Sequence, residues 1–321
     1  MIEADSLVKR YGPFEAVKGV SFRVETGQVI GLLGPNGAGK TSIMRILTCY
    51  HFPTSGTARV DTHDVVTHPH LVRQSVGYLP ENAPLYDDMK VREYLGFIAD
   101  ARGLSGARRA ERTDMVVSTC GLAQVFSREI RRLSKGYRQR VGLAQAILHD
   151  PSVLIMDEPT SGLDPNQIVE IRALIRDLGR EKTVILSTHI LQEVEALCRR
   201  VLIMNAGRLV AQGTPEEIAR GMQEGVLLSV SLKGPLDEAV TRTLGSVPGV
   251  RGVSAIRSLP QDRVEVDLDV AEGADPSEAV YDWAVSHGCK ILAMRTEKTR
   301  LEDLFARLTA GDPGGVAGHD A

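Results

Sequence analysis

The chain has 321 residues, of which 43% are hydrophobic and 25% charged, and its formal net charge is -3. At about 150 residues per domain this length predicts two domains, and the ordinary composition excludes collagen-like and wholly disordered chains. Because it has neither a run of about 18 apolar residues nor an excess of basic ones, the sequence predicts no membrane-spanning helix and no nucleic acid partner.

Short apolar segments alternate with helical patterns over residues 1–215. The segments predicted as buried parallel strands are Val29–Leu33, Val153–Met156 and Val184–Leu186. Val201–Met204 and Arg208–Ala211 flank the turn sequence Asn205-Ala-Gly207, which predicts a hairpin that closes the sheet. This alternation predicts an α/β domain with a mostly parallel sheet and crossover helices.

Residues 216–310 predict a smaller α+β domain of the ferredoxin-like type, followed by a Gly-rich, disordered tail over residues 311–321. The predicted strands are Leu228–Leu232, Gly249–Ile256, Val264–Val270 and Lys290–Arg295, and the predicted helices are Thr214–Gln223, Pro235–Leu244, Pro276–Ser286 and Leu301–Leu308. Apolar and acidic residues alternate in the third strand, so one sheet face should be buried and the other should carry a solvated acidic surface of Glu265, Asp267 and Asp269. No residue of this domain matches a catalytic motif, which favours a role in assembly or regulation.

Gly34-Pro-Asn-Gly-Ala-Gly-Lys-Thr41 fits the phosphate-loop pattern G-x-x-x-x-G-K-[ST] and lies between a predicted strand and a predicted helix. The alternative is a chance glycine turn, which this context disfavours. Glycines let backbone N–H groups face phosphate oxygens, and the helix N-terminus adds a partial charge of about +0.5. Lys40 should reach the β- and γ-phosphates, and the Thr41 hydroxyl should bind Mg²⁺. The residues assigned to the nucleotide here are Gly34, Pro35, Asn36, Gly37, Ala38, Gly39, Lys40, Thr41 and Ser42.

Two carboxylates, Asp157 and Glu158, end the predicted strand Val153–Met156. Alone, such a pair is more often a solvated turn. Beside a phosphate loop, Asp157 is better explained as a residue that holds Mg²⁺ at the carboxyl edge of the sheet, and Glu158 as the base that polarises the attacking water.

Three further features follow the phosphate loop one after another along the chain. Leu133-Ser-Lys-Gly-Tyr137 opens a predicted helix, Ser161-Gly-Leu-Asp-Pro165 follows the acid pair, and His189 follows the strand Val184–Leu186. A histidine after a strand is usually structural, but its place in this order favours a functional imidazole.

As a set, these motifs resemble the nucleotide-binding subunits of ABC transporters, over roughly residues 1 to 215. The resemblance implies a phosphate-loop ATPase core with a helical signature subdomain. It implies that ATP, with Mg²⁺, lies between two subunits of a head-to-tail dimer, for which a homodimer is the simpler expectation. ATP binding and hydrolysis by this cytoplasmic subunit would then drive transport through a separate permease, at the inner face of the cell membrane.

The resemblance also implies roles for individual residues. Tyr11 would stack on adenine, and Ser134 and Gly136 would contact the γ-phosphate held by the opposite subunit. Asp164 would couple the two sites, and His189 would contact the γ-phosphate and orient the attacking water.

Two segments depart from the family: one from its common signature Leu-Ser-Gly-Gly-Gln, the other from its usual metal-sensing glutamine. Lys135 and Tyr137 replace the third and fifth signature residues, and Glu81 stands in the segment Gly77-Tyr-Leu-Pro-Glu81 where the family has Gln. A carboxylate can still accept a hydrogen bond from metal-bound water, so Glu81 is also expected at the Mg²⁺. Both segments, and the appended C-terminal domain, are similar to the ABC-2-type exporter branch. The alternative function is a soluble ABC ATPase acting on a non-membrane partner, although such proteins carry two cassettes or long insertions.

Overall fold

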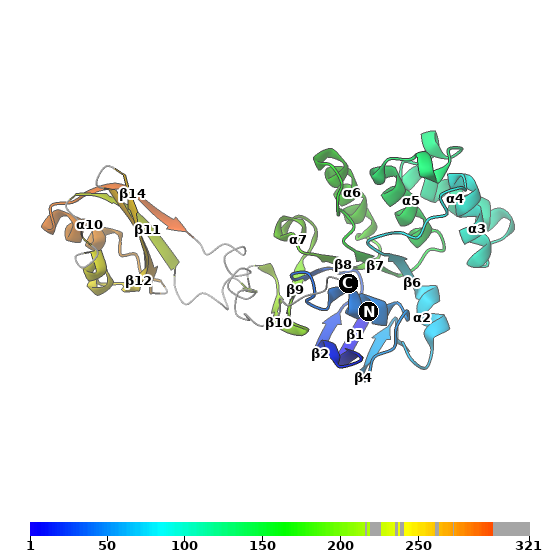
Figure 1. Cartoon of the computed structure of the whole chain (residues 1–321), viewed down its shortest axis with the longest axis horizontal. Helices are drawn as coiled ribbons and strands as arrows, with labels where there is room; N and C mark the ends of the chain where they lie inside the picture. Colours follow the sequence, from blue (N-terminus) through cyan, green and yellow to red (C-terminus); the bar gives the residue numbers. More distant parts are fainter. Residues whose placement is uncertain are drawn as a thin grey trace. The chain divides into compact units, whose positions relative to one another are not determined.

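The computed structural model describes residues 1–215, 217–218, 226–234, 237, 241–260, 263–271 and 273–297 (Figure 1). These residues form two compact units. The first is Met1–Pro215, and the second lies between residues 217 and 297.

A six-stranded sheet organises the first unit, in the order β10-β9-β3-β8-β7-β6. Its strands are β3 (Val29–Leu33), β6 (Val76–Leu79), β7 (Val153–Asp157), β8 (Thr183–Thr188), β9 (Arg200–Asn205) and β10 (Arg208–Gly213). All neighbours pair in parallel except β10, which returns antiparallel to β9 through a turn with positive φ at Ala206 and Gly207. The predicted parallel sheet and closing hairpin are therefore confirmed.

Helices connect and cover these strands. They are α1 (Lys40–Leu47), α2 (Pro69–Ser75), α3 (Val91–Ala101), α4 (Gly106–Thr119), α5 (Lys135–Ile147), α6 (Pro165–Leu178) and α7 (Leu191–Leu197), with short 3-10 turns at Ala123–Val125 and Ile130–Arg132. Contacts of α3 and α4 with each other and with α5 make the helical subdomain that the fold class predicted.

A second, antiparallel sheet in this unit was not predicted. Its order is β2-β1-β4-β5, formed by β1 (Ile2–Tyr11), β2 (Phe14–Val24), β4 (Ser55–Val60) and β5 (His63–Asp64). Figure 1 shows it on the side of the parallel sheet opposite α6 and α7. One apolar core joins the two sheets around α1, whose Ile43, Met44 and Ile46 are fully buried. The helix that starts in the phosphate loop is thus fixed on both sides by packing.

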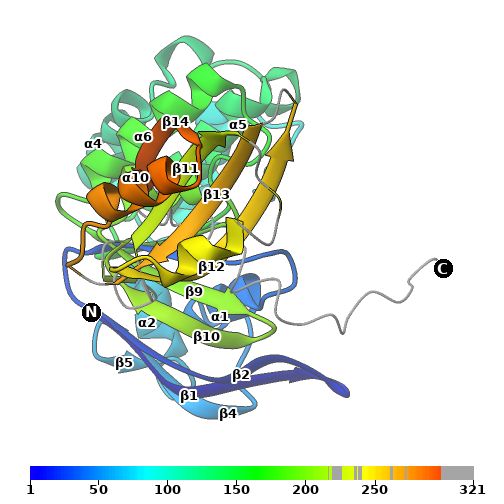
Figure 2. The ribbon, with the colours of Figure 1, turned by 90° about the vertical axis from the view of Figure 1, so that its left-hand side faces the viewer.

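The second unit contains a four-stranded antiparallel sheet in the order β12-β13-β11-β14. Its elements are β11 (Val226–Lys233), a 3-10 turn (Thr243–Ser246), β12 (Val250–Leu259), β13 (Arg263–Val270), α10 (Ser277–Ser286) and β14 (Lys290–Glu297). Figure 2 looks onto the sheet face that α10 covers, where Val266, Leu268 and Trp283 share a separate core. The four predicted strands and the helix before the last of them are present. The 3-10 turn overlaps the end of the predicted helix Pro235–Leu244, of which residues 235, 236 and 238–240 lie outside the described residues. The helices Thr214–Gln223 and Leu301–Leu308 and the tail 311–321 lie wholly or largely outside them.

The acidic face of β13 differs from the expectation of a freely solvated surface. Asp267 and Glu265 are only partly exposed, and both pair with Arg257 on the neighbouring strand, at 2.6 and 3.3 Å. Asp267 also accepts a hydrogen bond from Ser229. Arg257 on β12 therefore offsets part of this charge, and Ser229 on β11 satisfies one oxygen of Asp267.

Within the described part of the chain, no helix has the length and apolar character needed to cross a membrane. The four cysteines (Cys49, Cys120, Cys198 and Cys289) are buried and unpaired with one another.

Candidate nucleotide-binding site

The predicted functional segments meet because four neighbouring strands run parallel. β3, β8, β7 and β6 lie side by side, so the segments after them all leave from the same edge of the sheet. The phosphate loop follows β3, His189 follows β8, Glu158 follows β7 and Glu81 follows β6.

The phosphate loop is held so tightly that two of its glycines have no substitute. A Cβ on Gly39, whose φ is +99°, would lie 2.5 Å from the Ala16 carbonyl oxygen, and one on Gly34 would lie 2.5 Å from the Met204 carbonyl oxygen. The N–H groups of the first turn of α1 have no intrahelical acceptor, so the loop offers donors and a positive helix end to an anion.

Lys40 is the buried cation of this site and is only 6% exposed. Its Nζ donates hydrogen bonds to the carbonyl oxygens of Gly34 (2.7 Å) and Pro35 (3.1 Å) and lies 3.8 Å from Glu158 Oε1. Burial lowers the pKa of the Lys40 ammonium below its ordinary value, while nearby carboxylates, Glu158 foremost, act in the opposite direction. A phosphate beside it would supply further negative charge that favours the protonated form.

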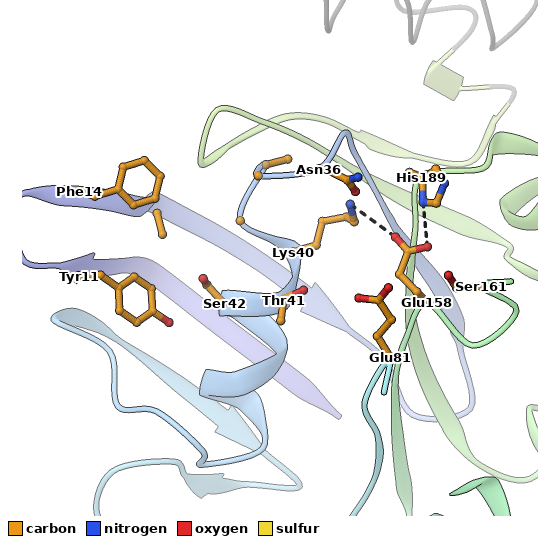
Figure 3. Close-up of a pocket in the computed structure, with 14 residues that line it drawn as sticks. Tyr11, Phe14, Asn36, Lys40, Thr41, Ser42, Glu81, Glu158, Ser161 and His189 are labelled. Carbon is orange, nitrogen blue, oxygen red and sulfur yellow. Dashed lines mark hydrogen bonds and ion pairs between the residues drawn. The ribbon is translucent and has the colours of Figure 1, made fainter. Parts of the chain in front are cut away.

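Glu158 joins Lys40 to His189. Its Oε2 lies 2.8 Å from His189 Nδ1, so one carboxylate contacts both the ammonium and the imidazole (Figure 3). The Glu158 backbone is left-handed, with φ of 49°, and its N–H is held by the Ser187 hydroxyl at 3.0 Å. The same hydroxyl donates to Asp157 Oδ1 at 2.5 Å. Ser187 therefore orients both acids of the pair.

A cavity of about 380 Å³ lies over these groups. The residues that line it are Tyr11, Phe14, Ala16, Asn36, Gly37, Ala38, Gly39, Lys40, Thr41, Ser42, Glu81, Glu158, Ser161 and His189. In Figure 3, Tyr11 and Phe14 lie at one end and Glu158 and His189 at the other, with Lys40 and Thr41 between them. An aromatic end and a cationic, hydrogen-bonding centre suit a purine base joined to phosphates.

Not every predicted residue lines this cavity. Gly34 and Pro35 contribute through their carbonyl contacts with Lys40, and Asp157 lies behind, 3% exposed. Ser134 and Gly136, at the start of α5, and Asp164, before α6, are outside the lining.

The signature segment is nevertheless tied to the residues after Glu158. The buried Gln139 side chain donates to the Pro159 carbonyl oxygen at 2.8 Å. A Cβ on Gly136 would lie 2.5 Å from Gln167, whose N–H donates to the Asp164 carboxylate at 2.9 Å. The start of α5 and the start of α6 therefore pack as one surface.

Sequence reasoning missed Phe14, Ala16, Ser161 and Gln139. Phe14 faces Tyr11 across the β1–β2 turn, a pairing that follows only from the unpredicted antiparallel sheet. Ser161 belongs to the predicted turn that follows the acid pair. Because it lies only three residues after Glu158, the sequence alone could have placed it near the cavity.

A phosphate loop after a buried strand, a buried lysine and a carboxylate paired with an imidazole define a phosphate-loop nucleoside triphosphatase. The model of the ABC transporter family matches residues 17–161. An uncharacterized ABC transporter ATP-binding protein YxlF of Bacillus subtilis is 36% identical over 292 residues, 88% of this chain and 97% of that protein. The daunorubicin resistance ATP-binding protein DrrA3 of Streptomyces coeruleorubidus is 32% identical over 319 residues, 97% of this chain and 96% of that protein.

A solved structure, an ATP-binding subunit of an ABC transporter, is 30% identical with a TM-score of 0.63, and the match covers 69% of this chain and 92% of that one. The chain belongs to the ATP-binding subunits of ABC transporters. The predicted family, fold class, ATPase activity and transport function are confirmed.

Proposed function

We propose that this ATPase subunit binds ATP with Mg²⁺, closes on a second copy of itself around two nucleotides, and drives an ABC-2-type permease from the inner face of the membrane. The observation that carries the proposal is the Lys40–Glu158–His189 arrangement at the phosphate end of the cavity. The geometry of this arrangement supports one assignment of roles to the residues around the cavity.

Tyr11 and Phe14 take the adenine, the loop from Gly37 to Ser42 takes the phosphates, and Lys40 neutralises the β- and γ-phosphate oxygens. Glu158, whose side chain is 10% exposed and whose carboxylate already lies 2.8 Å from His189 Nδ1, holds the attacking water and accepts its proton. His189 fixes the carboxylate and faces the γ-phosphate.

The oxygen donors near the phosphate loop fit Mg²⁺. The Thr41 hydroxyl, the Glu81 carboxylate and the buried Asp157 are hard oxygen ligands, which Mg²⁺ prefers. Among the described residues, no group of three or more His, Cys, Asp or Glu is arranged to hold a metal ion alone. A site with few protein ligands suits an ion that keeps phosphate and water oxygens in its coordination shell, as Mg²⁺ does. Mg²⁺ there would neutralise the charge developing on the γ-phosphate.

Dimer closure is proposed because the signature residues Ser134 and Gly136 lie outside the lining of their own nucleotide cavity. Ser134 is exposed at the start of α5, where its Oγ accepts only a long bond of 3.4 Å from the Tyr137 N–H. The Ser134 hydroxyl and the N-terminus of α5 can therefore contact the γ-phosphate of the opposite copy. Asp164 caps α6, whose first turn packs against the start of α5.

Ser134→Arg tests this proposal. In the Glu158→Gln background, ATP should convert monomer to dimer in analytical ultracentrifugation, and Ser134→Arg should keep the chain monomeric. The bulk and charge of Arg block the contact, while ATP affinity should stay within about threefold. Ser105→Arg, which places the same charge before another helix of the helical subdomain, is the matched control and should dimerise. Dimerisation of the Ser134→Arg protein would remove the signature from the proposal.

The membrane partner rests on the relatives. One is named for daunorubicin resistance, and a protein of Ralstonia nicotianae that is 38% identical over 219 residues is named for Nod factor export. Both names support an export permease, and co-purification of the tagged chain with a membrane protein tests it. Recovery of a soluble partner alone would contradict it.

The division at residue 215 is also a proposal, and a chain ending at Pro215 tests it. All cavity-lining residues fall between Tyr11 and His189, and the apolar cores of the two units share no residue. The shortened chain should therefore fold and bind ATP within about threefold of the full chain, by circular dichroism and equilibrium binding. A folded chain that cannot bind ATP would show the division to be wrong.

A further inference from the structure

Glu193 is a buried carboxylate in the first turn of α7, outside the lining of the nucleotide cavity. Only 1% of the residue is exposed. Burying an ionised carboxylate is costly unless hydrogen bonds and opposite charge compensate it, so its partners indicate why the fold keeps it.

Each oxygen of this carboxylate is bound by a different threonine. Oε1 accepts a hydrogen bond from the hydroxyl of Thr160, and Oε2 accepts one from Thr188 Oγ1 at 2.7 Å. Arg172 Nη2, on α6, lies 3.9 Å from Oε1 and supplies the opposite charge. Thr160 and Thr188 are themselves 4% and 0% exposed, so water does not compete for these bonds.

The two threonines belong to the two segments that carry the reacting pair. Thr160 lies two residues after Glu158 and next to Ser161, which lines the cavity. Thr188 directly precedes His189, and its hydroxyl also accepts from the Ile190 N–H at 3.0 Å. Since β7 and β8 are neighbours, Glu193 bridges the two chain segments just behind the contact between Glu158 and His189.

We propose that Glu193 is a positioning residue for ATP hydrolysis. By binding Thr160 and Thr188 together, it fixes the spacing of the segments after β7 and β8, and so holds the Glu158 carboxylate against the His189 imidazole at the phosphate end of the cavity. It contacts neither nucleotide nor metal. The inference rests on the proposed role of Glu158 as the base.

The test replaces each threonine by an isosteric residue without a hydroxyl. Thr160→Val and Thr188→Val should each lower kcat at least about 10-fold, because a displacement of roughly 1 Å at the reacting groups costs about 100-fold. KM and ATP affinity should stay within about threefold, since no binding residue is changed. Thr160→Ser and Thr188→Ser keep the hydroxyl and should retain kcat within about twofold.

Thr183→Val is the matched control for the full-length chain. Thr183 is the first residue of β8, as Thr188 is the last, and it is equally buried, but its hydroxyl accepts from the Gly27 N–H. This variant should lose thermal stability like Thr188→Val and keep its kcat. Glu193→Gln combined with Thr160→Val should lower kcat by less than the product of the two single losses, because both break one bridge.

The proposal is wrong if the Val variants lower kcat no more than Thr183→Val, if the Ser variants lose as much as the Val variants, or if the loss lies in ATP affinity. These outcomes do not depend on whether Glu193→Gln folds. Failure of the base assignment would show separately, as normal turnover in Glu158→Gln.

Discussion

Glu158→Gln should bind ATP as the parent chain does but lower turnover by roughly 100- to 10,000-fold, the range of general base catalysis. The amide keeps the size of the side chain and can still lie near Lys40 and His189, but it cannot accept a proton from water. Because hydrolysis would no longer open the closed state, ATP-bound dimer should accumulate. Steady-state hydrolysis and sedimentation with ATP measure the two effects.

Glu181→Gln is the control for this substitution. Glu181 is exposed and lies before β8, at the edge of the sheet away from the cavity, so its amide variant should hydrolyse ATP normally. Turnover of Glu158→Gln at the parent rate would show that Glu158 is not the base.

Lys40→Ala should weaken ATP binding by about 100-fold, equivalent to about 2.7 kcal/mol, since it removes the buried cation proposed to bind the phosphates. It also leaves Glu158 Oε1, 3.8 Å away, without that ammonium, so repulsion between carboxylate and phosphate adds to the loss. Equilibrium titration with a fluorescent ATP analogue measures the dissociation constant.

Lys182→Ala is the control that distinguishes the specific loss of Lys40 from the loss of any buried lysine. Lys182 is also largely buried, but its ammonium bonds Asp150 and the Pro151 carbonyl oxygen, away from the cavity. Its variant should be less stable yet keep ATP affinity within about threefold. Equal losses of affinity in both variants would mean that Lys40 acts on folding and not on the phosphates.

Much of the site follows from local sequence. The loop from Gly34 to Thr41 could be recognised because its glycines, lysine and flanking apolar strand are contiguous, and their chemistry needs no tertiary information. The approach of Glu158 to His189 could be expected because both follow predicted parallel strands. The alternating pattern of Val264–Val270 likewise fixed which face of the second sheet is buried.

The remaining features depend on packing between distant segments. The antiparallel sheet pairs β1 with both β2 and β4. Buried and exposed residues do not alternate regularly along Ile2–Tyr11, so the sequence carries no period-two pattern that would predict this strand. Glu193 lies among Gln192 and Glu195, so its neighbours in sequence indicate a solvated helix face. Its burial depends on Thr160, 33 residues away, and on Arg172 in the preceding helix.

The left-handed backbone of Glu158 has a consequence for selection on stability. A φ of 49° in a residue with a side chain costs of order 1 kcal/mol, and only glycine adopts it freely. Glycine at position 158 would relieve this backbone cost, but it would also remove the carboxylate that lies 3.8 Å from the buried Lys40 ammonium. An uncompensated buried charge costs more than this strain, about 3–5 kcal/mol, so Glu158→Gly should be no more stable than the parent chain, and the buried Lys40 ammonium is what keeps position 158 in its strained conformation.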